Sequence, residues 1–407
     1  MSKKPANAPP ETRVPASLSL FEPDAPAPGA PVSGALAAKK AARKAAGGPK
    51  ATAPTGATAA PPDPAALAGP LLAWFDGAAR DLPWRHDRTG YRVWVSEIMV
   101  QQTRVSTVIP YYGRFLDAFP TVAVLAGADL GQVLALWSGL GYYRRARGLH
   151  EGAREVVARF GGEVPGTVEG LRSIRGVGPY TAGAIASLAF GVRTPLVDGN
   201  VIRVLARLFA IVDEARQQKV QKRIWALAEA AVPAGRPGAF NESLMELGAT
   251  VCLPRDPLCL VCPLASRCAA RQQGIERSLP VLAKKSAPTA VQAASLVARR
   301  PGEVLLGRRH ADALFGGLWE PPTVEAASAE QARVALDAFA DPAARAAGSV
   351  RHVLSHRTME IHVFAGDPAA APTYPAVYDE VRWVTEGDLA SYGVSTLARK
   401  LLKKATS

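Results

Sequence analysis

Apolar residues recur with the helical period of about 3.6 residues through a long part of the chain, from Pro64 to about Ile275. Strand-like alternation is absent from this part. A window without charged residues, 176–192, contains a proline and is shorter than the roughly 20 residues that a membrane span needs. The pattern therefore predicts an all-helical domain over residues 64–275 and no membrane-spanning segment. The period is clear at Val201, Val204, Leu205 and Leu208.

The pattern changes after a basic, proline-bearing stretch, 276–288, which we interpret as an interdomain connector. Pro301-Gly302 then separates two apolar stretches, as the turn of a hairpin would. The segment 328–340 has helical spacing and lies between expected strands. Residues 289–407 are therefore predicted to form an α+β domain. Its expected strands include 294–298, 304–306, 359–364 and 381–384.

Residues 1–63 lack this patterning, and alanine and proline fill 30 of their positions. Such a segment cannot bury enough apolar surface to offset the entropy lost on ordering, so we predict a disordered tail. The formal net charge of the chain is +13, of which the tail supplies +4 and the predicted folded part +9. We interpret the positive folded part as a DNA-binding surface. The N-terminus has no apolar signal segment, so we expect a cytoplasmic protein.

The four cysteines lie together in one stretch, with the spacing C-x6-C-x2-C-x5-C. In a chain that is not secreted, such a group is better explained by a metal or cluster site than by disulfides. Four thiolates on one loop can ligate an iron–sulfur cluster or zinc. Structural zinc usually takes two C-x2-4-C pairs and only one is present, so the spacing favours the cluster, with zinc as the alternative. The expected ligands are Cys252, Cys259, Cys262 and Cys268.

A glycine turn between two predicted helices offers a site for a DNA phosphate. One helix ends at Gly176 and the next begins near Pro179, so backbone N–H groups around Gly176 and Gly178 can point at an anion. An ordinary helical hairpin has the same pattern. Asp198, twenty residues after Gly178, begins a D-G-N sequence at the start of another predicted helix. It can cap that helix, act as a functional carboxylate, or do both.

A single carboxylate interrupts an otherwise apolar predicted helix, 93–105. Glu97 stands beside Trp94 and other apolar residues. Desolvation there would raise its pKa, as a general acid working near neutral pH requires, whereas a glutamate at the solvent edge of the helix is the alternative. Gln102 and Thr103 follow on the same predicted helix and offer amide and hydroxyl groups to base edges.

Together and in this order, these motifs resemble the endonuclease III-like helix-hairpin-helix DNA glycosylase superfamily. Within it, the segments LPWR, SEIMVQQT, WSGLGYYRRAR, GVGPYTAGAI and LVDGNVIRVLAR resemble MutY-type adenine DNA glycosylases. The resemblance is nearly continuous over 64–275 and looser in the C-terminal domain. It implies a monomeric enzyme with a 4Fe–4S cluster that removes adenine opposite 8-oxoguanine or guanine from double-stranded DNA in base excision repair.

The resemblance also implies roles for single residues. Glu97 would protonate the departing adenine, and Asp198 would stabilise the positive charge that develops on the sugar. Strand-cleaving relatives carry a lysine where this chain has Tyr180, so base removal without efficient strand cleavage is expected. Tyr180 and Asn200 would support catalysis. The remaining implied contacts are Arg85 and Glu242 in the adenine pocket and Gln102, Thr103 and Tyr142 in the base stack and at the lesion strand.

The C-terminal domain resembles the Nudix-like module that reads 8-oxoguanine in this family, beginning with Gly316-Gly-Leu-Trp-Glu320. The acid-rich metal box of Nudix hydrolases is missing, which predicts binding without hydrolysis. The family's Phe-Ser-His recognition loop corresponds to Leu354-Ser355-His356, so Ser355 and His356 are left to make polar contacts.

One segment of the tail, Ser17–Phe21, is an apolar cluster in a polar surrounding. It resembles the Gln-Leu-Ser-Leu-Phe peptide by which bacterial repair proteins bind the replication sliding clamp, with serine in place of glutamine. The resemblance implies the clamp as a second partner.

Two other functions fit part of the sequence. One is a glycosylase of the same superfamily for another mispaired base, such as thymine or uracil. The other is an iron–sulfur protein that binds DNA without catalysis. Glu97 and Asp198 argue against the latter, because a protein that only binds DNA has no need of two acids facing a phosphate backbone.

Overall fold

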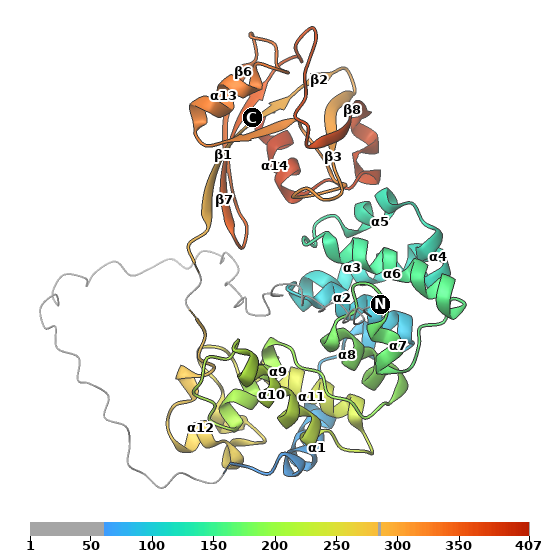
Figure 1. Ribbon diagram of the computed structural model, residues 1–407, viewed down its shortest axis with the longest axis vertical. Coiled ribbons are helices and arrows are strands. Elements are labelled where there is room, and N and C mark those ends of the chain that lie inside the picture. The colour runs from blue at the N-terminus through green and yellow to red at the C-terminus, as the bar shows by residue number, and fades with distance from the viewer. Residues whose placement is uncertain (1–60, 284–285, 407) are drawn as a thin grey trace, which may run out of the picture. The chain divides into compact units, whose positions relative to one another are not determined.

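The fold is described from a computed structural model of the chain, which covers residues 61–283 and 286–406. The predicted tail lies outside these residues except for 61–63, and Ser17–Phe21 lies outside them entirely. Helices extend from Pro64 to Ser278, and strands begin at Thr289 (Figure 1). The predicted fold class, an all-α domain followed by an α+β domain, is therefore confirmed. Within the described residues, no helix is both long and apolar enough to cross a membrane.

Short polar caps set where many of the helices of the first domain begin. The side chains of Thr89, Thr121, Asp129, Thr167 and Asp198 each accept a hydrogen bond from a backbone N–H in the first turn that follows. The α-helices are α1 (Ala68–Ala78), α2 (Gly90–Val100), α3 (Val105–Ala118), α4 (Val122–Gly127), α5 (Leu130–Trp137), α6 (Arg144–Phe160), α7 (Val168–Arg172), α8 (Pro179–Phe190), α9 (Gly199–Leu208), α10 (Gln218–Ala231), α11 (Pro237–Thr250) and α12 (Ala269–Gln272).

Helix α2 lies inside the helical domain and packs against α3, α6 and α8. Its residues Val93, Trp94, Val95, Ile98 and Met99 are all buried. A helix that is apolar around most of its circumference must be covered on several sides, which is why α2 occupies this position. The carboxylate that it carries is therefore enclosed by the fold.

The end of α2 differs from the prediction. The sequence predicts a helix through residue 105, but α2 ends at Val100 and a turn precedes α3. Gln102 and Thr103 therefore lie in a turn and not on the helix. Gln102 has a φ of 57°, a left-handed conformation that cannot continue a right-handed helix.

The second domain contains two four-stranded sheets and two α-helices. In the first sheet, with the order β5-β1-β7-β6, β1 is parallel to β7 and the other pairs are antiparallel. The second sheet has β3 between β8 and β4, with β2 on the same path. The elements are β1 (Thr289–Val297), β2 (Arg299–Arg300), β3 (Glu303–Arg309), β4 (Trp319–Glu320), β5 (Thr323–Ala326), α13 (Ala329–Leu336), β6 (Arg345–Val353), β7 (Arg357–Ala365), β8 (Tyr378–Thr385) and α14 (Thr396–Lys404).

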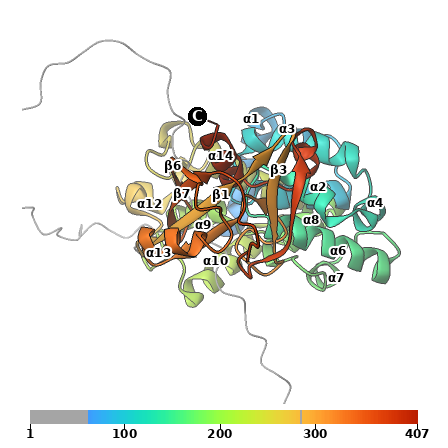
Figure 2. The same cartoon turned by 90° about the horizontal axis from the view of Figure 1, so that it is seen from above.

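Alternation along β1 explains how the two helices cover opposite faces of its sheet. Ala293 and Val297 belong to the core that contains α14, whereas Ala294 and Leu296 belong to the core that contains α13. Figure 2 shows β1, β6 and β7 in the view from above, and β7 lies between β1 and β6 in the sheet. A strand segment buried on both faces is largely apolar, and residues 293–297 of β1 are all buried, with Ser295 as the one polar member.

The hairpin at Pro301-Gly302 is confirmed, but its first arm differs from the prediction. Arg299 and Arg300 of β2 pair with β3, and Gly302 has a φ of 78°. Residues 294–297 belong instead to β1, which pairs with β5 and β7. These partners are distant in the sequence, so the local pattern could not identify them.

Candidate active site

A buried and a half-buried side chain from different helices meet inside the helical domain. Glu97 on α2 is 5% exposed, and its Oε2 accepts a hydrogen bond from the Tyr180 hydroxyl on α8. The same hydroxyl lies 3.6 Å from the Met245 sulfur on α11. The alternative of a solvent-edge glutamate is therefore wrong, and the carboxyl group of Glu97 is enclosed by three helices.

The surroundings of Glu97 raise its pKa from 4.5 to about 7. Desolvation is the largest cause, and the nearby negative charges of Glu242 and Asp198 act in the same direction. The hydrogen bond from Tyr180 and the charge of Arg85 oppose them. A carboxyl with this pKa is partly protonated at neutral pH, so it can donate a proton there.

Asp198 caps α9, as its position in the D-G-N sequence predicted. Its Oδ1 accepts from the Val201 backbone N–H at 2.7 Å, and its Oδ2 accepts from the Asn200 side-chain amide at 2.9 Å. Burial raises the pKa of Asp198, although both hydrogen bonds and the charge of Arg203 act to lower it. The carboxylate is thus half-buried but held by fixed donors.

A chain of hydrogen bonds leads from Asp198 toward the cysteine loop. Arg203 on α9 donates to Asn200 Oδ1 at 2.8 Å and to the Gly248 carbonyl at 2.7 Å. Its Nε donates to the Cys252 carbonyl at 2.8 Å. One buried guanidinium therefore connects the Asp198–Asn200 pair with the first cysteine of the loop. The sequence analysis did not identify Arg203.

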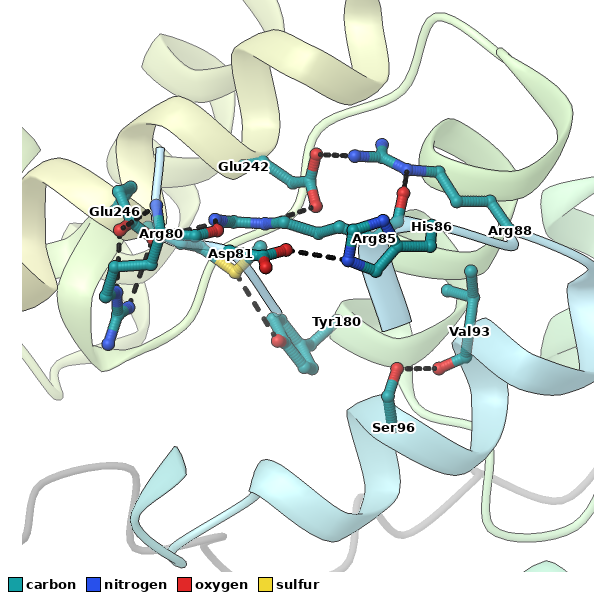
Figure 3. Close-up of polar contacts among 11 residues, drawn as sticks. Arg80, Asp81, Arg85, His86, Arg88, Val93, Ser96, Tyr180, Glu242 and Glu246 are labelled. Carbon is teal, nitrogen blue, oxygen red and sulfur yellow. Dashed lines mark hydrogen bonds and ion pairs between the residues drawn. The ribbon is translucent and has the colours of Figure 1, made fainter. Parts of the chain in front are cut away.

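Arginines and glutamates form a network near Tyr180 (Figure 3). Arg85 donates to Glu242 Oε1 at 3.2 Å and to Glu246 Oε2 at 2.9 Å, so it lies between the two acids. Arg80 binds Glu246 at 2.6 Å, and Arg88 binds Glu242 at 2.8 Å. Both carboxylates are almost fully buried. The network fixes the orientation of Arg85, which the resemblance assigned to the adenine pocket.

Glu246 is a central member of this network that the sequence analysis missed. Burial acts to raise its pKa, but the hydrogen bonds and charges of Arg80 and Arg85 outweigh burial, so the pKa is lowered. A signal was available, because Glu242 and Glu246 are four residues apart and must share one face of a helix. Two acids on one face of a largely apolar helix indicate cationic partners.

The glycine turn lies between α7 and α8 as predicted, but α7 ends at Arg172 and not at Gly176. Gly176 has a φ of 81°, and Gly178 is the N-cap of α8 with Pro179 as its first residue. A Cβ on Gly176 would lie 3.4 Å from the Gly148 backbone, an ordinary contact, so the positive φ is what favours glycine there. The turn and the first residues of α8 form a helix start of the kind that binds phosphate.

The four cysteines line one pocket with Arg207 and Arg271. Cys259 lies in a short 3₁₀ helix, Cys259–Val261, and Cys268 is the N-cap of α12. Arg207 is buried, and its Nη1 lies 3.2 Å from the Cys252 sulfur. The structure thus brings the four thiols together in a cationic surrounding. Among the described residues, no three His, Cys, Asp or Glu side chains are placed to hold a single metal ion.

The residues expected to enter the DNA stack lie in two turns. Gln102 and Thr103 follow α2, and Tyr142 precedes α6. Gln102 and Tyr142 have φ values of 57° and 48°, and both are half-buried. Thr103 Oγ1 accepts from Arg145 at 2.9 Å.

The expected lesion contacts lie at the tip of a hairpin in the second domain. Ser355 and His356 are exposed in the turn between β6 and β7. The turn is closed by a hydrogen bond of 2.8 Å from the Leu354 N–H to the Arg357 carbonyl. Leu354 packs partly against the core that contains α14.

Comparison with known proteins identifies the family. A model described as HhH-GPD superfamily base excision DNA repair protein matches residues 95–230, and a NUDIX domain model matches residues 293–404. The adenine DNA glycosylase of Homo sapiens is 38% identical over 401 residues, which cover 83% of this chain and 73% of the human protein. The chain belongs to the adenine DNA glycosylase family.

A second relative agrees with this assignment, and one solved structure is also similar to the chain. The adenine DNA glycosylase of Rattus norvegicus is 39% identical over 398 residues, covering 82% of this chain and 76% of the rat protein. A solved structure described as a thermostable thymine-DNA glycosylase is 30% identical, with a TM-score of 0.48, and covers 52% of this chain and 97% of that one. Family membership confirms that the protein is a DNA glycosylase of base excision repair and excludes the alternative of a DNA-binding protein without catalysis.

Proposed function

We propose that the protein removes adenine paired with 8-oxoguanine or guanine, as a monofunctional glycosylase. The observation that carries this proposal is the pair of carboxyl groups, Glu97 and Asp198, which lie near enough for the charge of Asp198 to raise the pKa of Glu97 but have different hydrogen-bond partners. Breaking an N-glycosidic bond needs a proton for the departing base and a negative charge near the sugar. Two acids in unlike surroundings can divide these tasks.

Glu97 acts as the general acid. The Tyr180 hydroxyl donates to Oε2, which leaves Oε1 to carry the proton toward adenine. As the bond between C1′ and the base nitrogen breaks, its electron pair leaves with the protonated adenine and positive charge develops on the sugar. The Asp198 carboxylate, held by Asn200 and the Val201 N–H, stabilises that charge. Water then adds to C1′ and gives up a proton to the ionised Glu97, which restores the acid.

Base removal without efficient strand cleavage follows from Tyr180. A lysine at this position would attack C1′ as a nucleophile, whereas a phenol hydrogen-bonded to Glu97 has no free amine to form a Schiff base. Arg85 and Glu242 line the pocket that receives the extruded adenine. Extrusion is cheapest at a mispair, which contributes to selectivity.

DNA is held by three parts of the chain in this proposal. The glycine turn at Gly176 and Gly178 binds a phosphate, and Gln102, Thr103 and Tyr142 enter the base stack. Ser355 and His356 contact 8-oxoguanine. The last assignment is supported by the exposed position of both residues at a hairpin tip, where a nucleic-acid base can reach them.

The four cysteines would hold a 4Fe–4S cluster. The donor set fits, because four thiols share one pocket and the guanidinium of Arg207 lies 3.2 Å from a cysteine sulfur, which suits an anionic cluster. When bound, the cluster supplies a covalent cross-link that fixes the loop 252–268.

A further partner proposed from the sequence is the replication sliding clamp, which would bind Ser17–Phe21. Adenine opposite 8-oxoguanine arises during replication, and a tether to the clamp would raise the local concentration of the enzyme. Fluorescence anisotropy of a peptide spanning 12–24 on purified clamp tests this. The control peptide carries Leu20→Ala and Phe21→Ala, and equal weak binding of both peptides would exclude the interaction.

Single-turnover assays on four duplexes test the main proposal. Adenine opposite 8-oxoguanine and adenine opposite guanine should be cleaved at the glycosidic bond, whereas adenine opposite cytosine and thymine opposite guanine should not. Glu97→Gln should bind the first duplex and lose base removal. Preferred removal of thymine would favour the related glycosylase activity instead, and iron content of the same sample tests the cluster.

A further inference from the structure

The side chain of Arg145, near the start of α6, is a buried cation without a carboxylate partner in the described part of the chain. It is 8% exposed. Desolvation lowers its pKa to about 10, so the guanidinium remains protonated at neutral pH. A buried charge is costly unless polar atoms replace its hydration. Its position therefore needs an explanation, which the catalytic roles proposed above do not supply.

Backbone carbonyls at the end of α2 replace the water that would hydrate one amino group of the guanidinium, Nη1. Nη1 of Arg145 donates to the carbonyls of Ile98 at 2.8 Å and Met99 at 3.0 Å, and also to the carbonyl of Gln101. The last carbonyls of a helix have no partner within the helix. The guanidinium therefore caps α2 at the point where the chain turns into Gln102.

The turn before α6 and the Thr103 side chain supply the acceptors for the other amino group, Nη2. Nη2 of Arg145 donates to Thr103 Oγ1 at 2.9 Å and to the carbonyls of Leu140 and Gly141 at 3.3 and 3.2 Å. The guanidinium also lies over the Tyr142 ring, 5.3 Å from its centroid. One planar group thus joins the turn that carries Gln102 to the turn that carries Tyr142.

Both turns need such support, because each places a residue other than glycine in the left-handed region. Gln102 has a φ of 57° and Tyr142 a φ of 48°. Residues with a Cβ adopt this conformation only where the surrounding structure imposes it, and such strain clusters at functional sites. The two strained residues are also two of the three side chains that the proposed function places within the base stack.

We propose that Arg145 is a positioning residue that holds Gln102 and Tyr142 in one rigid arrangement for entry into the duplex. It contacts neither the adenine nor the sugar. The inference rests on the proposed function for the role of Gln102 and Tyr142, and adds the group that couples them. Loss of Arg145 should therefore reduce extrusion of the adenine and leave the proton transfer from Glu97 unchanged.

The experiment separates extrusion from chemistry in the full-length chain. In a Glu97→Gln background, 2-aminopurine replaces the target adenine opposite 8-oxoguanine, and its fluorescence reports extrusion from the stack. Arg145→Met removes every guanidinium donor, and Arg145→Lys keeps the charge with fewer donors. The matched control is Arg154→Met, because Arg154 is an exposed arginine of the same helix that also donates to a carbonyl, that of Ala126.

Arg145→Met should reduce extrusion per active site by at least about tenfold, since misplacement of positioning groups by about 1 Å can cost up to 10²-fold. Arg145→Lys should fall between it and the parent, and Arg154→Met should match the parent. When Glu97 is retained and excision is measured, the pH profile of excision should keep its shape in all three variants. A role in overall folding alone would instead lower the active fraction and leave extrusion per active site unchanged.

Circular dichroism tests whether each variant is folded. If Arg145→Met does not fold, the extrusion measured with Arg145→Lys tests the inference alone. Extrusion within twofold of the parent in the folded variants would overturn the inference. Failure of the proposed function has a different signature, namely normal base removal by Glu97→Gln or no fluorescence change with the parent protein.

Discussion

Replacing Glu97 by glutamine should abolish base removal and at the same time stabilise the fold at alkaline pH. Burial raises the pKa of Glu97 from 4.5 to about 7, so ionisation of this group is harder in the folded chain than in the unfolded one. Its contribution to stability is complete below about pH 4.5, is lost as the pH rises toward 7, and does not change further above that. The difference between the two pKa values corresponds to about 3 kcal/mol.

Glutamine cannot ionise, so the variant avoids this loss of stability at high pH. Its amide also keeps an oxygen that can accept a hydrogen bond from Tyr180. Urea denaturation of the parent and of Glu97→Gln at pH 5 and pH 8 measures the effect. The stability of the variant relative to the parent should rise by about 2 to 3 kcal/mol between these two values. Base removal by the variant should fall by about 10²–10⁴-fold, which is the usual contribution of a general acid.

Glu246→Gln is the matched control of opposite sign. The pKa of Glu246 is lowered, because the hydrogen bonds and charges of Arg80 and Arg85 outweigh its burial. Its ionised form therefore stabilises the fold above the unfolded pKa, and this contribution is lost as the pH falls through the folded pKa. Glu246→Gln should be less stable than the parent at pH 8. The difference in stability between variant and parent should be smaller at acidic pH. If Glu97→Gln gained no stability relative to the parent between pH 5 and pH 8, the assignment of a raised pKa to Glu97 would be refuted.

Three further outcomes are expected. In Tyr180→Phe, loss of the hydrogen bond that lowers the pKa of Glu97 should move the alkaline limb of the single-turnover pH profile upward; an unmoved limb would contradict this. Deleting 289–407 should reduce the preference for 8-oxoguanine over guanine and largely preserve removal of adenine opposite guanine, whereas equal loss on both would indicate a role in stability. Duplex affinity should fall with salt by roughly 0.9 in log K per log salt for each phosphate neutralised, and a salt-insensitive complex would argue against a basic DNA surface.

The sequence predicted the parts of the helical domain that short motifs define. The caps at Asp198 and Gly178 and the apolar helix around Glu97 have local signals, and the structure has them as predicted. The roles of these residues in catalysis came from the resemblance and stay predictions. What brings Glu97 and Tyr180 together is the packing of α2 on α8, which no local pattern shows.

The features that the sequence did not predict depend on contacts between distant segments. Helix α2 ends at Val100, although the predicted helix continued to Val105, and the turn that follows is held by Arg145 from another helix. Likewise, residues 294–297 pair with strands far along the chain and not with their neighbour across the hairpin. A buried arginine surrounded by carbonyls has the same sequence signature as an exposed one, so burial has to be seen in the structure.

Asn200→Ala provides a test of the second carboxylate. Asp198 must be ionised to stabilise the sugar cation, so its pKa sets the acid limb of the pH profile. Burial raises this pKa, and the hydrogen bond of 2.9 Å from Asn200 is one of the interactions that lower it. Removing that donor should raise the pKa further and move the acid limb upward.

The alkaline limb, which reports Glu97, should remain in place in Asn200→Ala, so the pH range of activity narrows from the acid side. The hydrogen bond from the Val201 N–H to Asp198 is a backbone contact and survives the substitution. Single-turnover excision between pH 5 and pH 9 measures both limbs in one experiment. A shift of the alkaline limb with a stationary acid limb would mean that the two acids had been assigned to the wrong roles, because Tyr180 and Asn200 each donate to only one of them.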